Sequence, residues 1–440
     1  MNTKRYIFLY ALCAALLFSG CGFRTVSEMY CLPKRSESYS QLQSAIDTAM
    51  SGMEYAAPIS GENQQTVQMA DLNGDGQDEY ILFARANTEK PLQMLIFTKN
   101  EDSFGLMAAI ESRGASFEQV EYVNIDDHPG LEIVVGKQVG DQVLRALNVY
   151  TFAGGEPEQL MSANYHKFLT CDLDEDGASE LMLIQPGLAE GERGVAVLYS
   201  FDNGEMARSM ENELSQSAYS VRRIMISKLQ NGAPAVYVAS SLDENTIITD
   251  IFAMKYGKFR NISLSSESGT SVQTMRNYYV YADDVDNDGV LELPDLITMH
   301  PLSESRSVSH QYLIRWFSMD IYGKETDKRY TFHNFVGGWY LELDSLWAQR
   351  VSVVQKDGVY KFYVWDEEFL DASLVFSIYT LTGSDREEKA AENDGFVLYR
   401  TDTVVYAARL ESGAVEYGIG QDDLTPYFNM IHQDWKTGET

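Results

Sequence analysis

The sequence predicts a mainly β protein, in which a β-propeller of about five recognisable blades is followed by a small α+β domain. Three observations lead to this prediction. An acid-rich turn recurs along residues 60–335, an apolar and aromatic strand follows each turn, and each turn joins two short runs rich in β-branched and aromatic residues. The turns begin at residues 71, 124, 172, 228 and 284, at intervals of 53, 48, 56 and 56 residues. A unit of about fifty residues cannot bury both faces of its own sheet, so neighbouring units are expected to pack around an axis.

Residues 1–21 are predicted to be a lipoprotein signal peptide. Two basic residues precede an apolar run, Tyr6 to Phe18, that is too short to span a membrane comfortably. The run ends in LLFSGC, which resembles the bacterial lipobox, and the resemblance implies that Cys21 is lipidated and becomes the mature amino terminus. An ordinary cleaved signal and an uncleaved anchor are the alternatives. The polar residues 22–37 are then a linker that holds the folded part off the membrane.

Residues 38–59 are expected to form a helix and a lead-in to the repeats. Six apolar residues fall at helical spacing on one face: Leu42, Ala45, Ile46, Ala49, Met50 and Met53. This face is expected to pack on the propeller or on the C-terminal domain. The alternative is a helix that binds a partner.

The recurring turn has the composition of a metal-binding loop. Oxygen-bearing side chains stand at positions 1, 3 and 5, a glycine stands at position 6 and a glutamate at position 9. Three copies follow this pattern, and their candidate metal ligands are Asp71, Asn73, Asp75 and Glu79; Asp172, Asp174, Asp176 and Glu180; and Asp284, Asp286, Asp288 and Glu292. Glycine lets the chain curl until alternate side chains point to one centre, and a hard divalent cation offsets the repulsion between the acids. The alternative is a tight hairpin without metal, because Asp, Asn and Gly favour turns in any case.

Two further copies in the same frame are degenerate. One has Asn124, Asp126 and Glu132 with His128 at position 5, and the other is the neutral stretch KLQNGAPAV at residues 228–236. Neither is expected to hold a metal ion.

The pattern D-x-[DN]-x-D-G-x-x-E between apolar strands resembles the FG-GAP or VCBS repeat of integrin-α-like propellers. The resemblance covers residues 60–335. It implies that the loops bind calcium within a blade, in up to three structural sites formed by the twelve ligands named above.

Residues 336–440 lack the loop pattern and are expected to form the small α+β domain. Two hairpin-like pairs are followed by a predicted closing helix with Leu424, Tyr427, Phe428 and Ile431 on one face. The alternative is that these strands supply a sixth blade. Three tryptophans are expected in the aromatic core rather than in a sugar-stacking platform: Trp339, Trp347 and Trp365.

The charge balance argues against nucleic acid as a partner. The chain has 34 basic and 65 acidic residues, a net charge of −31, and no basic cluster that could hold phosphates. Signatures for a serine nucleophile elbow, a zinc helix, a P-loop and paired C-x-x-C are absent from the sequence, so no catalytic residue is assigned.

The sequence therefore favours a lipid-anchored propeller on the extracytoplasmic side of a bacterial cell membrane. Calcium would stabilise it, and it would bind or scaffold an extracytoplasmic protein or glycan, meeting the membrane through its lipid anchor only. The alternative is a polysaccharide lyase or glycoside hydrolase whose carboxylates surround the propeller channel.

Overall fold

The computed structural model describes residues 37–100, 103–126, 128–140, 145–189, 191–277, 280–302 and 312–431. The predicted signal peptide, its Cys21 and the linker up to residue 36 lie outside this part of the chain. Within the described residues, no helix combines the length and the apolar character needed to cross a bilayer.

Six antiparallel sheets of four or five strands make up the fold, and we number them sheet 1 to sheet 6 along the chain. Sheet 1 contains β1 (Met53–Tyr55), β2 (Val67–Ala70), β3 (Glu79–Ala86), β4 (Leu92–Asn100) and β5 (Ser103–Ser112). Sheet 2 contains β6 (Ser116–Val123), β7 (Glu132–Gln138), β8 (Arg145–Thr151) and β9 (Glu158–Tyr165). Sheet 3 contains β10 (Lys167–Cys171), β11 (Glu180–Gln185), β12 (Val195–Asp202) and β13 (Glu205–Glu213).

The second half of the chain forms the other three sheets. Sheet 4 contains β14 (Val221–Lys228), β15 (Pro234–Ser241), β16 (Ile247–Lys255) and β17 (Lys258–Asn261). Sheet 5 contains β18 (Leu293–Thr298), β19 (Tyr312–Met319), β20 (Glu325–Asn334), β21 (Trp339–Leu343) and β27 (Phe428–Met430). Sheet 6 contains β22 (Val351–Lys356), β23 (Val359–Trp365), β24 (Ala372–Thr382), β25 (Phe396–Arg400) and β26 (Val404–Leu410).

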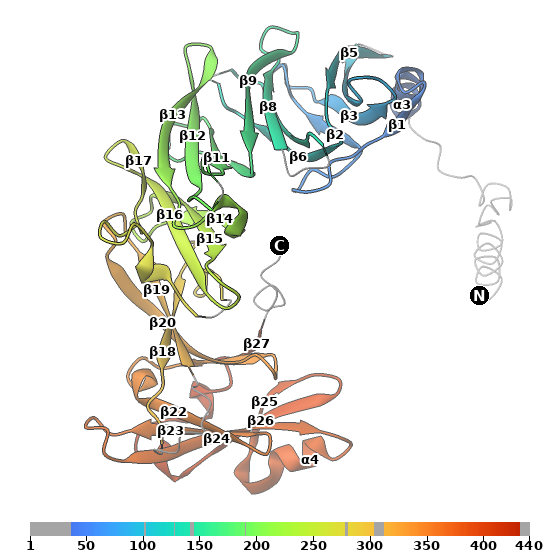
Figure 1. The fold of residues 1–440 in the computed structure, drawn as a ribbon. Coiled ribbons are helices and arrows are strands. Elements are labelled where there is room, and N and C mark those ends of the chain that lie inside the picture. The colour runs from blue at the N-terminus through green and yellow to red at the C-terminus, as the bar shows by residue number, and fades with distance from the viewer. Residues whose placement is uncertain are drawn as a thin grey trace, which may run out of the picture.

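The sheets pack face to face in the order of the chain. Each large hydrophobic cluster joins residues of two successive sheets, as Phe83 of sheet 1 and Phe117 of sheet 2 do in one, and Phe332 of sheet 5 and Phe362 of sheet 6 in another. Figure 1 shows the sheets along an arc whose first and last members lie at opposite ends. The closed ring expected of a propeller is therefore not formed in the described part of the chain.

Helices cover the outward faces of the two end sheets. Helix α3 (Glu37–Ala49) packs Leu42 and Ile46 against Leu82 and Phe97 of sheet 1. At the other end, Ala390 of α4 (Arg386–Ala391) packs against the β26 side of sheet 6. The apolar face of the N-terminal helix thus packs on the first sheet, as the sequence predicts.

The C-terminal segment continues the repeat. Strand β21 pairs with β20 of sheet 5 and with β27, so sheet 5 crosses the expected boundary between residues 335 and 336, and the strands after it form sheet 6. The predicted closing helix is wrong. Residues Gln421–Asp423 form a 3₁₀ turn and Phe428–Met430 form a strand, because pairing with β21 satisfies the backbone there and Pro426 has no N–H to donate to a helix.

The three tryptophans of this segment belong to the core, as predicted. Trp339, Trp347 and Trp365 are 0%, 6% and 8% exposed. The Trp365 indole N–H donates to Ser352 Oγ at 2.8 Å, so its polar atom is satisfied within the fold.

A buried carboxylate organises the polar interior of sheet 4. Asp250 is fully buried, and its Oδ1 accepts hydrogen bonds from Ser215 Oγ and Ser271 Oγ at 2.6 Å and from Asn261 Nδ2 at 2.9 Å. Its Oδ2 accepts the Ser215 backbone N–H at 2.8 Å. The network joins β16 to β17 and to the segments that flank sheet 4.

Asp250→Ala should destabilise the protein by about 3 kcal/mol, because it leaves several buried donors without an acceptor. Chemical denaturation would measure this change. Glu244→Ala, which truncates an exposed acid in the turn between β15 and β16, is the control and should stay within about 0.5 kcal/mol of the parent. Equal losses for the two variants would contradict the assignment.

Candidate metal loops and an adjoining cleft

The acid-rich turns occupy equivalent places in successive sheets. We number them loop 1 to loop 5, with residues 71–79, 124–132, 172–180, 228–236 and 284–292. Loops 1 to 4 connect β2 to β3, β6 to β7, β10 to β11 and β14 to β15, and loop 5 leads into β18. The carbonyl of Asp71 accepts the N–H of Leu131 at 2.9 Å, and that of Asn124 accepts the N–H of Ser179 at 2.7 Å. Loop 1 is thus linked to loop 2, and loop 2 to loop 3.

A buried glutamate closes four of the loops at position 9. These side chains are at most 6% exposed, and they are Glu79, Glu132, Glu180 and Glu292. In each, Oε2 accepts the backbone N–H of the residue at position 2, at 3.0, 2.7, 2.8 and 3.1 Å respectively. Burial raises the pKa of all four carboxyl groups, to about 7 for Glu180 and Glu292. The glutamate ties the start of each loop to the strand that follows it.

The backbone of loops 1, 3 and 5 curls through two left-handed residues, at positions 4 and 6. Position 4 is Gly74, Glu175 or Asn287, with φ of 74°, 62° and 60°, and position 6 is Gly76, Gly177 or Gly289, with φ of 84°, 95° and 83°. The N–H of the glycine at position 6 donates to the aspartate at position 1, at 2.9, 3.1 and 2.9 Å. The glycine is needed because its missing Cβ removes the steric cost of this conformation.

Loops 3 and 5 each gather three carboxylates that could hold a metal ion. In each group the ligand oxygens lie within 4.8 Å of one another, and the groups are Asp172, Asp174 and Glu180, and Asp284, Asp286 and Glu292. Two buried oxygens of these groups have no hydrogen-bond partner among the described residues, Oδ1 of Asp172 and Oε1 of Glu292. An all-oxygen donor set with orphaned acceptors suits a hard divalent cation. The two predicted ligands at position 5, Asp176 and Asp288, lie outside these groups.

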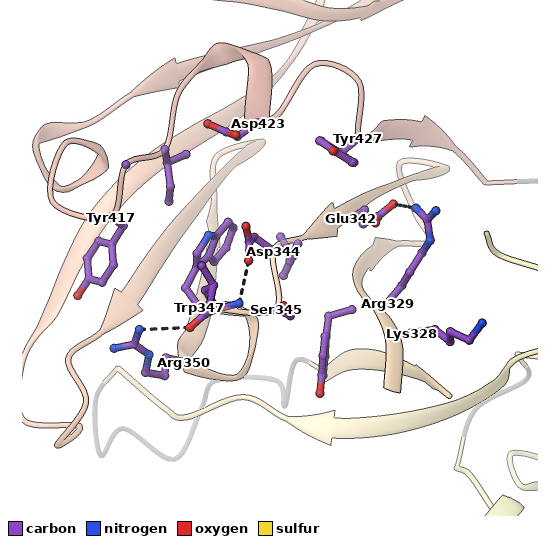
Figure 2. A pocket seen from close by; sticks show the side chains of 15 residues that line it. Lys328, Arg329, Glu342, Asp344, Ser345, Trp347, Arg350, Tyr417, Asp423 and Tyr427 are labelled. Carbon is purple, nitrogen blue, oxygen red and sulfur yellow. Dashed lines mark hydrogen bonds and ion pairs between the residues drawn. The ribbon is translucent and has the colours of Figure 1, made fainter. Parts of the chain in front are cut away.

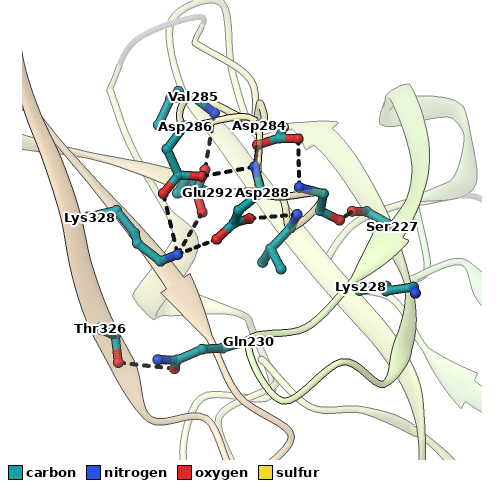
Figure 3. Close-up of polar contacts among 12 residues, drawn as sticks. Ser227, Lys228, Gln230, Asp284, Val285, Asp286, Asp288, Glu292, Thr326 and Lys328 are labelled. Atoms are coloured by element: carbon teal, nitrogen blue, oxygen red, sulfur yellow. Dashed lines mark hydrogen bonds and ion pairs between the residues drawn. The ribbon is translucent and has the colours of Figure 1, made fainter.

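A lysine reaches into loop 5, as Figure 3 shows. Lys328 Nζ lies 2.6 Å from Asp288 Oδ2, 3.4 Å from Asp286 Oδ2 and 3.9 Å from Glu292 Oε1. The hydrogen bond to Asp288 raises the pKa of Lys328, and the same bond lowers the pKa of Asp288. The sequence motif gave no indication of this contact, because Lys328 follows loop 5 by more than thirty residues.

Loop 1 is held by its own amide groups. Asn73 Nδ2 donates to Glu79 Oε1 at 3.2 Å and to Asp75 Oδ2 at 3.4 Å, while the N–H of Gly74 donates to Asp71 Oδ1 at 2.8 Å. All four predicted ligands of loop 1 therefore take part in hydrogen bonds within the loop. In the described residues, three-carboxylate groups of the kind seen in loops 3 and 5 do not occur in loop 1.

The glutamate at position 9 has a different second partner in each loop. Its Oε1 accepts from Thr98 Oγ1 at 3.2 Å in loop 1 and from Thr151 Oγ1 at 3.0 Å in loop 2, and it faces Lys328 in loop 5. For Glu180 of loop 3, the described residues offer Oε1 no donor. Loop 3 is therefore the acid loop with the least internal compensation for its charge.

The two degenerate loops are satisfied in other ways. In loop 2, Asp126 is 2% exposed and its Oδ1 lies 3.1 Å from His128 Nδ1. Loop 4 packs beside loop 5, where Lys228 forms a parallel bridge with Val290 and Ser227 Oγ donates to the Gly289 carbonyl at 3.2 Å.

A cleft of about 460 Å³ lies between strands β20 and β21 of sheet 5 and the segments that precede and follow sheet 6 (Figure 2). Aromatic side chains line it, namely Tyr330, Trp347, Tyr417 and Tyr427. Tyr427 is 42% exposed, whereas Trp347 is 6% exposed. The cleft therefore presents an accessible tyrosine above a mostly buried aromatic floor.

Charged groups of both signs surround these aromatic rings. Arg329 forms an ion pair with Glu342, and the Arg350 guanidinium lies 5.9 Å from the centre of the Tyr417 ring. Asp344 and Asp423 complete the acidic side of the cleft. A ligand with hydroxyl or carboxyl groups could contact aromatic faces and guanidinium groups here at the same time.

Comparisons with known proteins do not assign the chain to a family. No family model and no curated protein matches it. Among solved structures, the exotype rhamnogalacturonan lyase YesX is 12% identical, with 74% of this chain and 67% of that chain covered and a TM-score of 0.29. The Bacillus licheniformis rhamnogalacturonan lyase PL11 is 12% identical, with 73% and 72% covered and a TM-score of 0.30. A protein from Lactobacillus plantarum is 9% identical, with 72% and 86% covered and a TM-score of 0.28. Similarity at this level assigns neither a shared fold nor an activity.

The raised pKa of Glu180 predicts how the stability of the protein depends on pH. Its pKa is about 7 in the folded protein against a usual 4.5, so without metal the folded state binds more protons than the unfolded chain between these values. The free energy of unfolding should therefore fall as pH rises through this window. Glu180→Gln should reduce that fall and raise the melting temperature at pH 8 in the presence of a chelator. Thermal unfolding at pH 5 and pH 8 tests this, and an equally steep fall in the variant would contradict it.

Proposed function

We propose that this chain is a lipid-anchored, extracytoplasmic binding module built from propeller-like blades and stabilised by calcium. The observation that carries the proposal is the recurrence of the acid loop at equivalent places, with buried carboxylate oxygens that lack hydrogen-bond donors in loops 3 and 5. A repeated loop that leaves such oxygens unpaired needs a cation to offset the cost of burying them. Each of the six sheets corresponds to one blade in this proposal.

Calcium is the cation that we propose, because its ligand number and distances are flexible and all the donors are oxygens. Magnesium prefers a near-ideal octahedron and keeps several water ligands, which suits a protein cage less well. Loop 3 is the strongest candidate, since it has a three-carboxylate group and the least internal compensation for it. Loops 1 and 5 are the further candidates.

The ligand that we propose is an extracytoplasmic protein or glycan that enters the cleft beside strands β20 and β21 of sheet 5. An exposed tyrosine beside guanidinium groups is typical of binding surfaces, and the pairing of Arg329 with Glu342 fixes the position of one of these groups. The polysaccharide-acting enzyme considered from the sequence would need carboxylates that converge around a central channel. The described residues form an open arc, so we do not propose an enzymatic function.

Asp174→Ala should weaken stabilisation by calcium, because it removes one carboxylate of the loop 3 group. At millimolar calcium and an assumed dissociation constant of about 0.1 mM, the loss should be on the order of 1.4 kcal/mol. Glu175→Ala removes the adjacent acid, which lies outside the group, and should leave the calcium response unchanged. Melting temperatures with calcium and with chelator give the comparison. No effect of calcium on the parent protein would refute the structural role of the metal.

Cys21→Ser should move the protein from the membrane fraction to the soluble extracytoplasmic fraction, because the variant has no thiol to carry the lipid. Fractionation of cells that express the full chain, followed by detection of the protein, measures this. Ser19→Ala, a conservative substitution that keeps Cys21, is the control. Membrane retention of the Cys21 variant would contradict the proposed anchor.

A further inference from the structure

Lys328 supplies loop 5 with a positive charge from another strand. Its Nζ lies within 4.0 Å of three of the four predicted loop 5 ligands, and its side chain is 20% exposed. In Figure 2 the amino group points away from the cleft, and in Figure 3 it points into the acid loop.

A β-bulge places the lysine there. The pairing of β19 with β20 shifts between Trp316 and Phe317, which face Arg329 and Asp327, so Lys328 is left without a partner across the strands. Sheets 1, 2 and 3 have the same shift, between β4 and β5, β8 and β9, and β12 and β13, and it leaves out Met107, Leu160 and Ser209. The bulge is thus a repeated feature, and of these four sheets only sheet 5 puts a cationic side chain on it.

In loop 5, one buried carboxylate oxygen lacks a hydrogen-bond donor. Glu292 is fully buried, and its Oε1 has no hydrogen-bond partner among the described residues. The nearest cationic atom is Lys328 Nζ, at 3.9 Å, which is too far for a hydrogen bond. The position 5 ligand, Asp288, turns its Oδ2 to the same amino group. The lysine therefore neutralises the loop only partly.

We propose that Lys328 is a tethered cation that competes with divalent metal for loop 5. The inference rests on the calcium binding proposed above and adds that Lys328 lowers the calcium affinity of loop 5. Loop 5 matches the sequence pattern fully, yet it should bind calcium more weakly than it would without Lys328. A metal ion has to displace an amino group that the chain holds at high effective concentration beside Asp286 and Asp288.

Calcium titration calorimetry on Lys328→Met tests the proposal, in a background with Asp174→Ala to remove the binding of loop 3. The variant should bind calcium at loop 5 at least about tenfold more tightly than the background protein, because metal entry no longer breaks a charge-assisted hydrogen bond. Adding Asp286→Asn should abolish the gain, which assigns it to loop 5. Lys328→Arg keeps the charge and should bind as weakly as the background protein.

Lys324→Met is the matched control. It removes the same charge from an exposed position in the connection between β19 and β20, so a general gain from the more negative protein would appear in it as well. Equal affinities for Lys328→Met and Lys324→Met would overturn the competition. Calcium binding to loop 3 in the parent, with no gain from Lys328→Met, would refute this inference and leave the proposed function standing. No calcium binding by any folded variant would refute both.

Discussion

The buried glutamate at the end of each acid loop is the contact on which the arrangement of the loops depends. It accepts the N–H of the residue at position 2, so one side chain fixes both the curl of the loop and its place beside the strand that follows. This contact recurs in loops 1, 2, 3 and 5, with Glu79, Glu132, Glu180 and Glu292 in the same role. Burying a carboxylate costs free energy, however, and a different group offsets this cost in different sheets. Threonine hydroxyls serve loops 1 and 2, a lysine serves loop 5, and loop 3 has no such donor among the described residues. The loops thus share one backbone geometry but differ in how far the protein itself compensates the buried carboxylate.

Much of this arrangement follows from the spacing of the residues in the sequence. The interval between turns, the apolar and aromatic strands beside them and the glycine at position 6 predict the mainly β class and the equivalence of the loops, and the apolar face of residues 42–53 predicts the N-terminal helix. The open arc could not be predicted, because residue spacing does not encode the angle between packed sheets. The segment around Leu424 and Phe428 has helical spacing but forms a turn and an edge strand, since a short apolar run fits both. The role of Lys328 depends on a bulge that only the strand register reveals.

The metal loop and the cleft share strand β20. Lys328 and Arg329 are consecutive, yet the first contacts the acids of loop 5 and the second pairs with Glu342 inside the cleft. Successive side chains of a strand point to opposite faces, so β20 presents one of these residues to the loop and the other to the cleft. A shift of the backbone at the bulge would therefore alter both sites together. In a protein with a net charge of −31, each of these two basic side chains is paired with acids, Lys328 with those of loop 5 and Arg329 with Glu342 of β21.

The helices on the two end sheets limit how the molecule can associate. A sheet in the middle of the arc buries both faces against its neighbours, and the same apolar surface on a terminal sheet would accept a further sheet from another copy. Helix α3 covers that surface on sheet 1, and α4 covers part of it on sheet 6. The two helices thus cap the ends of the stack, as terminal units do in repeat proteins. If either helix were removed, apolar side chains of an end sheet would be exposed to water and become a site for aggregation.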